Sequence, residues 1–247
     1  MQISISNNTH ELGKAAASTA TKHILEAIHE RDRANIILAT GASQFEVLNQ
    51  LVKASIPWEK VTMFHLDEYI GLSYDHPASF RRYLTERFLQ KIDFSCTYHL
   101  INGEKNPLEE CQRIGELIKQ YPIDVALVGI GENGHLAFND PPADFDIEDP
   151  YIIVNLDDAC RRQQFGEGWF ISMDVVPQQA ISMSIRQIMK SKTIVTSVPD
   201  TRKAEAVKNT IEQPVSPLFP ASILRNHPQV YLFLDKFSAQ SLAHAPA

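Results

Sequence analysis

Two patterns of hydrophobic and polar positions alternate along this chain. Short, nearly continuous apolar runs predict strands buried on both faces, whereas apolar residues three or four positions apart predict amphipathic helices. After a short opening strand, the predicted strands are residues 35–39, 61–66, 98–101, 123–130, 180–185, 193–198 and 230–234. The predicted helices are residues 9–31, a segment through Phe45, Leu48 and Leu51, residues 78–92, 107–120, a helix that begins at Pro199 and Asp200, and residues 220–225.

This alternation predicts an α/β fold with three layers, in which a mostly parallel sheet carries helices on both faces in a Rossmann-like arrangement. No repeat or low-complexity linker interrupts the pattern, so residues 1–247 are expected to form a single domain. The least regular region is residues 143–168, in which only residues 151–156 are strand-like. A long, weakly patterned segment of this kind is a candidate lid if it lies beside a site.

Composition and charge narrow the class of protein. The chain has 247 residues, 44% of them hydrophobic, and a net charge of -7 without a basic patch, which argues against a nucleic-acid partner. Cys96, Cys111 and Cys160 lack Cys-x-x-Cys spacing, which predicts neither a disulfide framework nor a zinc site and favours a reducing cytoplasm. The first ten residues lack the pattern of a secretory signal, and no apolar run approaches the ~20 residues of a membrane span. We therefore expect a cytoplasmic protein without a membrane partner.

The stretch around which the chain is organised follows the predicted strand of residues 123–130. Glycines at 129, 131 and 134 allow a sharp turn and a close approach to a ligand, and they place His135 and Asp140 just past the strand's carboxyl end. Open α/β sheets bind ligands at that edge. A structural, buried histidine is the alternative for His135, but the neighbouring turn and polar groups favour a functional one.

The same three glycines spell the Gly-x-Gly-x-x-Gly pattern of dinucleotide-binding folds. In that fold the last glycine opens a long helix, whereas Pro141 and Pro142 interrupt this chain before two helical turns could form. Asp157 is the only supporting feature, because it follows at about the distance of a ribose-binding acid. We therefore reject a dinucleotide site.

Other strand ends also carry polar groups. Thr40, Gly41 and Ser43 precede a helix, where free N–H groups and the helix dipole favour an anion; the alternative is that Ser43 only caps the helix. Asp67 follows the strand of residues 61–66 and is either functional or a capping or solvated acid. Lys203 lies in the first turns of a helix, an unfavourable place that an adjacent anion would relieve, unless it is simply a solvated lysine.

Together these segments resemble the glucosamine-6-phosphate deaminase (isomerase) family, in the wider group that includes 6-phosphogluconolactonases and ribose-5-phosphate isomerases. The resemblance spans most of the chain. It is carried by Leu66 to Leu72 (LDEYIGL) with His76-Pro77 after it, by Gly129 to Asp140 (GIGENGHLAFND), by the Thr40-Gly41 loop and by Lys203. It implies a sheet of the sugar-phosphate isomerase type and a small sugar phosphate as ligand.

The resemblance also implies roles for individual residues. Asp67 would move a proton between C2 and C1 of the open-chain sugar, and His135 would help to open the pyranose ring. Asn133 and Asp140 would position that histidine, although some members of the family have aspartate at the first position and most have glutamate at the second.

The same resemblance implies a phosphate-binding set. It comprises Thr40, Gly41, Ser43 and Lys203, together with an arginine that is either Arg161 or Arg162. A desolvated aspartate is a stronger base than one in water, and histidine suits the ring oxygen because its pKa lies near neutrality.

The expected reaction converts glucosamine 6-phosphate into fructose 6-phosphate and ammonia by isomerisation and deamination, with no metal or organic cofactor. One alternative is a 6-phosphogluconolactonase, whose usual motif, Asp-Gly-His-Thr followed by Ala-Ser, differs from the Asn-Gly-His-Leu-Ala-Phe-Asn-Asp found here. The other is a sugar-phosphate-binding regulator without turnover, suggested by Asn133 and Asp140. The sequence leaves open a homo-oligomer and a gluco or galacto substrate.

Overall fold

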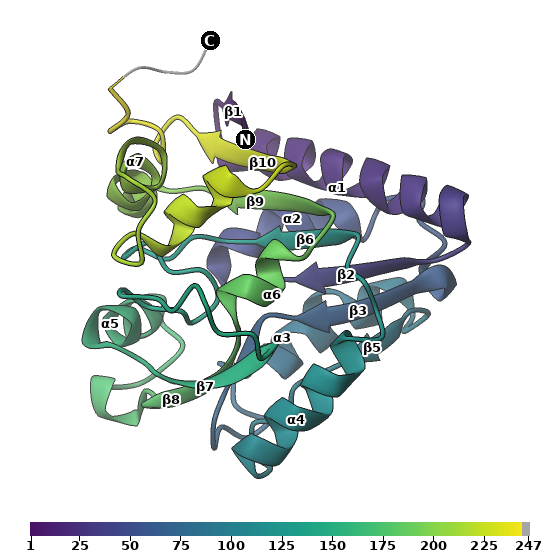
Figure 1. The fold of residues 1–247 in the computed structure, drawn as a ribbon, viewed down its shortest axis with the longest axis horizontal. Helices are drawn as coiled ribbons and strands as arrows, with labels where there is room; N and C mark the ends of the chain where they lie inside the picture. Colours follow the sequence, from purple (N-terminus) through teal and green to yellow (C-terminus); the bar gives the residue numbers. More distant parts are fainter. Residues whose placement is uncertain (244–247) are drawn as a thin grey trace.

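The computed structural model describes residues 1–243, so residues 244–247 of the expected domain lie outside it. Its centre is a seven-stranded sheet in the order β1-β10-β9-β6-β2-β3-β5, and every neighbouring pair is parallel. The strands are β1 (Gln2–Ser6), β2 (Ala34–Leu38), β3 (Val61–His65), β5 (Thr97–His99), β6 (Val125–Val128), β9 (Thr193–Val198) and β10 (Val230–Asp235). The parallel sheet predicted from the sequence is confirmed (Figure 1).

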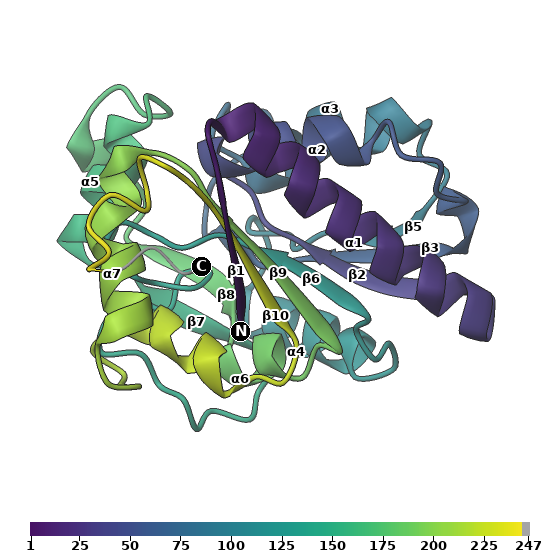
Figure 2. The same ribbon diagram turned by 90° about the horizontal axis from the view of Figure 1, so that it is seen from above.

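Helices cover both faces of this sheet, as expected (Figure 2). On one side lie α1 (Thr9–Arg31), α2 (Phe45–Leu51) and α3 (Phe80–Arg87), and on the other lie α4 (Pro107–Ile118), α6 (Ile185–Met189) and α7 (Ala204–Glu212). Successive residues of a strand point to opposite faces, so Ile36 and Leu38 of β2 join the core beneath α1 while Ile37 joins the core beneath α4. This explains why each strand reads as an unbroken apolar run.

A second, antiparallel sheet of three short strands extends from the first. It consists of β4 (Asp67–Tyr69), β8 (Gln179–Met183) and β7 (Tyr151–Asn155). The predicted strand of residues 61–66 therefore does not end in a loop, because the chain enters β4 after Leu66 and pairs with β8. The predicted strand of residues 180–185 corresponds to β8 and the strand-like residues 151–156 to β7, whereas β4, with three residues, is too short to show a period.

Some predicted helices differ from the observed ones. The helix predicted for residues 78–92 is α3 followed by a separate 3-10 turn, η3 (Leu89–Ile92), and the helix predicted for residues 220–225 is the 3-10 helix η6 (Pro220–Asn226). The remaining 3-10 turns are η1 (Ala42–Gln44), η2 (Trp58–Lys60), η4 (Met173–Val175) and η5 (Thr201–Lys203). The helix α6, which spans only five residues, was not predicted.

The weakly patterned region of residues 143–168 contains β7 and a helix, α5 (Asp158–Gly166). Asp157 caps α5, because its side chain accepts a hydrogen bond from the backbone N–H of Cys160. This acid therefore has a structural role, in line with the rejection of a dinucleotide site. In residues 1–243, no helix is both long and apolar enough to cross a membrane.

Glu68 ties the start of α3 to β4. Its buried carboxylate accepts hydrogen bonds from the Ser79 hydroxyl (3.0 Å) and from the backbone N–H groups of Phe80 (3.2 Å) and Arg81 (2.9 Å). The Arg81 guanidinium adds a contact of 3.2 Å. Glu68 is thus the capping acid of the pair that follows β3, which leaves Asp67 free of that role.

Candidate active site

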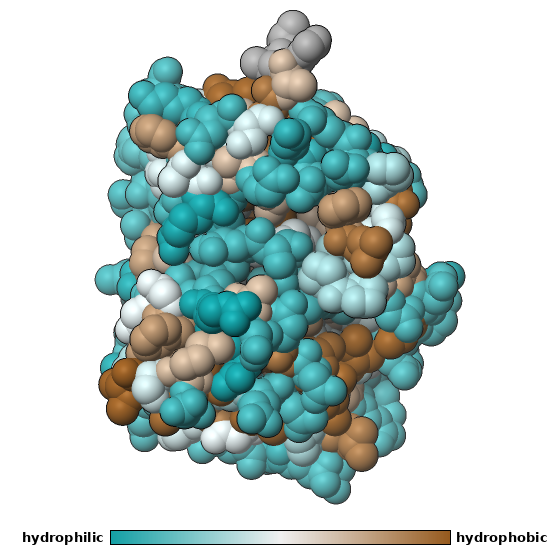
Figure 3. Space-filling model, turned by 90° about the vertical axis from the view of Figure 1, so that its left-hand side faces the viewer, coloured by the Kyte–Doolittle hydropathy of each residue, from teal (hydrophilic) through white to brown (hydrophobic). Residues whose placement is uncertain are grey.

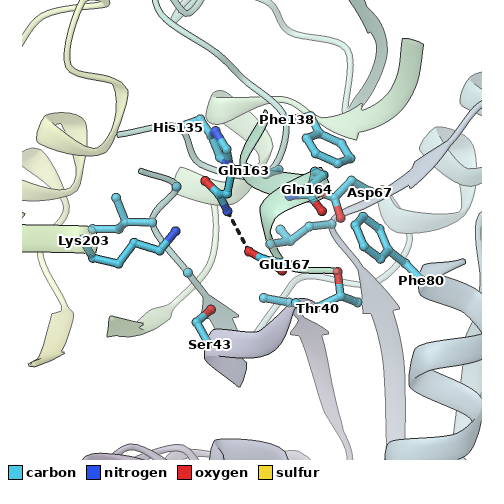
Figure 4. A pocket seen from close by; sticks show the side chains of 17 residues that line it. Thr40, Ser43, Asp67, Phe80, His135, Phe138, Gln163, Gln164, Glu167 and Lys203 are labelled. Atoms are coloured by element: carbon cyan, nitrogen blue, oxygen red, sulfur yellow. Dashed lines mark hydrogen bonds between the residues drawn. The ribbon is translucent and has the colours of Figure 1, made fainter. Parts of the chain in front are cut away.

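A pocket lies at the carboxyl ends of β2, β3, β6 and β9, the edge where open α/β sheets bind ligands. About 500 Å³ is free of atoms here when the open solvent at its mouth is included. Its walls come from the loop of residues 40–43, the start of β4, the glycine turn after β6, the end of α5 and the turn η5 that precedes α7 (Figure 4). The face that carries α5 and α7 is largely hydrophilic (Figure 3).

Asp67 and His135, which the sequence placed at the ends of two different strands, line the same pocket. Asp67 is only 6% exposed, and no hydrogen bond to its carboxylate occurs within the described part of the chain. Burial, and then the charge of Glu68, raise the pKa of Asp67 well above the ordinary aspartate range. Asp67 is therefore a stronger base than an aspartate in water.

His135 is held beside Asp140. Its Nδ1 atom lies 3.0 Å from Oδ1 of Asp140, although the ring is turned so that this contact falls outside hydrogen-bond geometry. Asn133 links the two, since its side-chain amide donates to Asp140 (2.9 Å) and accepts from the backbone N–H of His135 (3.1 Å). Burial opposes ionisation of Asp140, but the contacts with His135 and Asn133 outweigh it and lower the pKa of Asp140.

The glycine turn makes room for the imidazole. A β-carbon on Gly131 would fall closer than 3.0 Å to the His135 ring, a distance that real β-carbons essentially never show. Gly134 has a positive φ of +87°, which favours glycine. Both glycines thus serve the placement of His135, and no helix follows them before Pro141.

The far end of the pocket is suited to an anion. Lys203 is 5% exposed, its ammonium points into the pocket, and no ion pair or hydrogen bond of this group occurs within residues 1–243 (Figure 4). Burial lowers the pKa of Lys203. Thr40, Gly41 and Ser43 line the same end, and Ser43 does not cap the following helix, since its hydroxyl accepts from the Gln44 side chain instead.

Comparison with known proteins decides the family. The model of the family of glucosamine-6-phosphate isomerases/6-phosphogluconolactonase matches residues 7–232. The chain belongs to this family. A glucosamine-6-phosphate deaminase of Lactobacillus delbrueckii subsp. bulgaricus is 33% identical over 243 residues, which are 98% of this chain and 100% of the relative. The enzyme of the same description from Listeria monocytogenes is 36% identical over 231 residues, which are 93% and 97% of the two chains.

Solved structures agree with the fold. A monomeric glucosamine-6-phosphate deaminase matches with a TM-score of 0.89 and 33% identity, covering 98% of this chain and 100% of that one. A 6-phosphogluconolactonase from Trypanosoma brucei matches with a TM-score of 0.81 at 17% identity, covering 98% of both chains, which shows a shared fold. The glucosamine-6-phosphate isomerase/6-phosphogluconolactonase family thus accounts for the architecture observed here.

Neither arginine expected at the phosphate lines the pocket in this member of the glucosamine-6-phosphate isomerase/6-phosphogluconolactonase family. The Arg161 guanidinium donates to the carbonyl groups of Met173 (3.0 Å) and Val176 (3.1 Å), so it ties α5 to the segment that follows it. Arg162 lines a neighbouring hollow together with Arg202. The side chains of Arg161 and Arg162 therefore lie apart from Thr40, Gly41, Ser43 and Lys203, the other residues expected to bind the phosphate.

Residues of α5 line the pocket instead, and sequence reasoning missed them. They are Gln163 and Gln164 of α5 and Glu167, which directly follows α5 and comes four and three positions after these glutamines, so that it lies on the same side of the helix. Gln164 accepts a hydrogen bond from the Tyr69 hydroxyl (2.8 Å), and Gln163 donates to Glu167 (3.0 Å). Recognising residues 158–166 as a helix would have been the only sequence signal for this set.

His135, Asp140 and Cys160 also form a small cluster beside the pocket. One potential ligand atom from each lies within 4.8 Å of the other two. Burial, and then the charges of Asp140 and Asp157, raise the pKa of the Cys160 thiol far above its usual range. Because metals bind the thiolate, a cysteine held neutral in this way is a poor metal ligand.

Proposed function

We propose that this protein is a glucosamine-6-phosphate deaminase, which converts glucosamine 6-phosphate and water into fructose 6-phosphate and ammonia. The observation that carries the proposal is the placement of Asp67 and His135 in one pocket that also contains the Lys203 ammonium. The relatives of the same description, at 33% and 36% identity over nearly the whole chain, support it.

The reaction begins with opening of the pyranose ring, for which we propose His135. Its ring can take the proton of the anomeric hydroxyl and return a proton to the ring oxygen. Asp140, with its lowered pKa, remains ionised and stabilises the protonated imidazole, while Asn133 fixes the carboxylate in place. Asp140 and Asn133 therefore act through His135.

Asp67 then moves a proton between two carbons. Its carboxylate removes the proton from C2 of the open-chain amino aldehyde and returns it to C1, and a second proton passes from the amine to O1, so that an enolamine is the intermediate. The product is a 2-imino sugar, and addition of water at C2 releases ammonia and leaves the ketone. The raised pKa of Asp67 suits both steps, because the protonated carboxyl must persist until it reaches C1.

The phosphate would bind at the opposite end of the pocket from the reacting carbons. Lys203 supplies the positive charge, and Thr40, Gly41 and Ser43 supply hydroxyl and backbone donors. Binding energy from this remote group holds C1 and C2 in register with Asp67.

Two other activities predict different results. A 6-phosphogluconolactonase hydrolyses an ester and does not need a base that removes a proton from carbon. The buried Asp67 therefore favours the deaminase. A binding protein without turnover would not need a carboxylate with a raised pKa facing open pocket space.

The test is to incubate the purified chain with glucosamine 6-phosphate and to measure ammonia and fructose 6-phosphate. Equal amounts of both products are expected, whereas 6-phosphogluconolactone should not be hydrolysed above its spontaneous rate. Galactosamine 6-phosphate in a parallel assay defines the configuration that the pocket accepts at C4. If the protein bound the amino sugar but formed neither product, the proposal that it is a deaminase would be wrong.

We also propose that the protein acts as a monomer in the cytoplasm. The structural relative is a monomeric enzyme, and Cys96, Cys111 and Cys160 are all free thiols, which suits a reducing compartment. Light scattering should give the mass of one chain, and a larger mass would contradict the monomer. Cell fractionation should recover the protein with cytoplasmic markers.

A further inference from the structure

The anion-binding end of the pocket contains a carboxylate. Glu167 lines the pocket together with Lys203, Gly41 and Ser43, and it also lines an adjoining hollow with Ser43 and Lys203. Its Oε2 atom lies 3.9 Å from the position that a β-carbon on Gly41 would take. The acid therefore reaches the loop whose donors face the proposed phosphate position (Figure 4).

Two hydrogen bonds hold the Glu167 side chain in this position. The Gln163 amide donates to Oε1 (3.0 Å), and the Trp169 indole N–H donates to Oε2 (3.2 Å). Trp169 is itself packed edge-on against Phe45 of α2, with ring centroids 6.4 Å apart. The carboxylate is thus directed at the pocket and is not a freely rotating surface group.

At the anion-binding end of the pocket, Glu167 is the acid within residues 1–243 that faces Lys203 without a cation of its own. Arg202, the other nearby cation, lies 2.9 Å from Asp200 and 3.6 Å from Glu132. Burial is the main influence on the pKa of Lys203 and lowers it, and the charge of Glu167 is the largest influence that opposes this shift. Glu167 therefore partly neutralises the ammonium on which an anionic ligand would depend.

A phosphate dianion and a carboxylate repel each other more strongly in a partly buried pocket than in bulk water. We propose that Glu167 is an internal anion that competes with the substrate phosphate for Lys203 and the loop of residues 40–43. It thereby determines how strongly the pocket discriminates between phosphorylated and neutral sugars. This inference rests on the proposed function, since it assigns the phosphate to this end of the site.

The test measures binding of inorganic phosphate to the full chain by calorimetry. Glu167→Gln keeps the size of the side chain and removes its charge, so phosphate should bind at least about tenfold more tightly, the effect of one like charge a few ångströms away. KM for glucosamine 6-phosphate should fall in parallel. The control is Glu205→Gln, which changes net charge equally at an exposed position of α7 outside the pocket, and its phosphate affinity should equal that of the parent.

Glu167→Ala provides a second variant that removes the charge without adding an amide. Phosphate affinity that is unchanged or weaker in both variants, with thermal unfolding like that of the parent, would overturn the inference even if the parent releases ammonia. Conversely, tighter phosphate binding in both variants supports it even if the parent gives no product from glucosamine 6-phosphate. The phosphate titration therefore tests the role of Glu167, and the product assay tests the deaminase activity, independently of each other.

Discussion

The imidazole ring of His135 lies where a β-carbon on Gly131 would have to be. Gly131→Ala should therefore displace the ring, and a displacement near 1 Å lowers turnover by about a hundredfold. Gly166→Ala is the matched control, because no heavy atom lies within 4 Å of its added β-carbon. We expect both variants to fold, as judged by circular dichroism, and only Gly131→Ala to lose ammonia release. Full activity of Gly131→Ala would contradict the role given to His135.

Asp67→Asn should lower kcat by about a hundredfold or more, because the amide cannot remove the proton from C2. The binding of inorganic phosphate should change little, since Asp67 and Lys203 line different parts of the pocket. Initial rates and phosphate calorimetry on the same preparations separate the two effects. If the variant were as active as the parent, Asp67 would have no part in the mechanism.

The same substitution should stabilise the fold at neutral pH. The pKa of Asp67 is raised in the folded state by burial and by Glu68, so between about pH 3.9 and the raised pKa the folded chain binds more protons than the unfolded chain. Stability is therefore lost as pH rises through this window. Asp67→Asn removes that loss, and each 1 kcal/mol recovered raises Tm by about 2–4 °C in a chain of this size.

Thermal unfolding across pH checks this prediction. The Tm of Asp67→Asn should exceed that of the parent most at pH 8, and the difference should narrow as pH falls toward the ordinary aspartate range. Asp174→Asn, at an exposed position, should show no such difference. A Tm difference that is constant with pH would mean that Asp67 is not desolvated.

Lys203→Met should raise KM for glucosamine 6-phosphate by at least about tenfold and lower kcat less, because it removes a charge that binds the phosphate without touching the reacting carbons. Lys208→Met, in the helix α7 that begins directly after Lys203 but outside the pocket, is the control and should match the parent. An unchanged KM in Lys203→Met would remove this lysine from the phosphate site.

Much of the fold could be predicted because its strands are buried on both faces. Strands such as β6 and β9 then appear as continuous apolar runs, and α1 appears as a long stripe of small and aliphatic residues. The strand β4 and the helix α6 could not be predicted, because they have only three and five residues and follow β3 and β8 almost without a break.

The site was predictable only where its residues follow a strand directly. Asp67 comes soon after β3 and His135 lies in the glycine turn after β6, and both positions place the side chains at one edge of the sheet. Glu167 directly follows α5, a helix whose approach to the pocket depends on tertiary contacts such as that of Arg161 with Met173. The arginine expected at the phosphate was proposed from the same segment, where sequence order alone does not tell which face of a helix meets the pocket.

Glu68 and Asp67 are adjacent, yet within residues 1–243 only the carboxylate of Glu68 is hydrogen-bonded, to Ser79, Phe80 and Arg81. A descendant that abandoned the reaction would still require Glu68 in order to begin α3, so selection for folding alone would preserve half of this acidic pair. Presence of the glutamate in a distant relative is thus evidence of shared architecture, and only the preceding residue reports on shared chemistry.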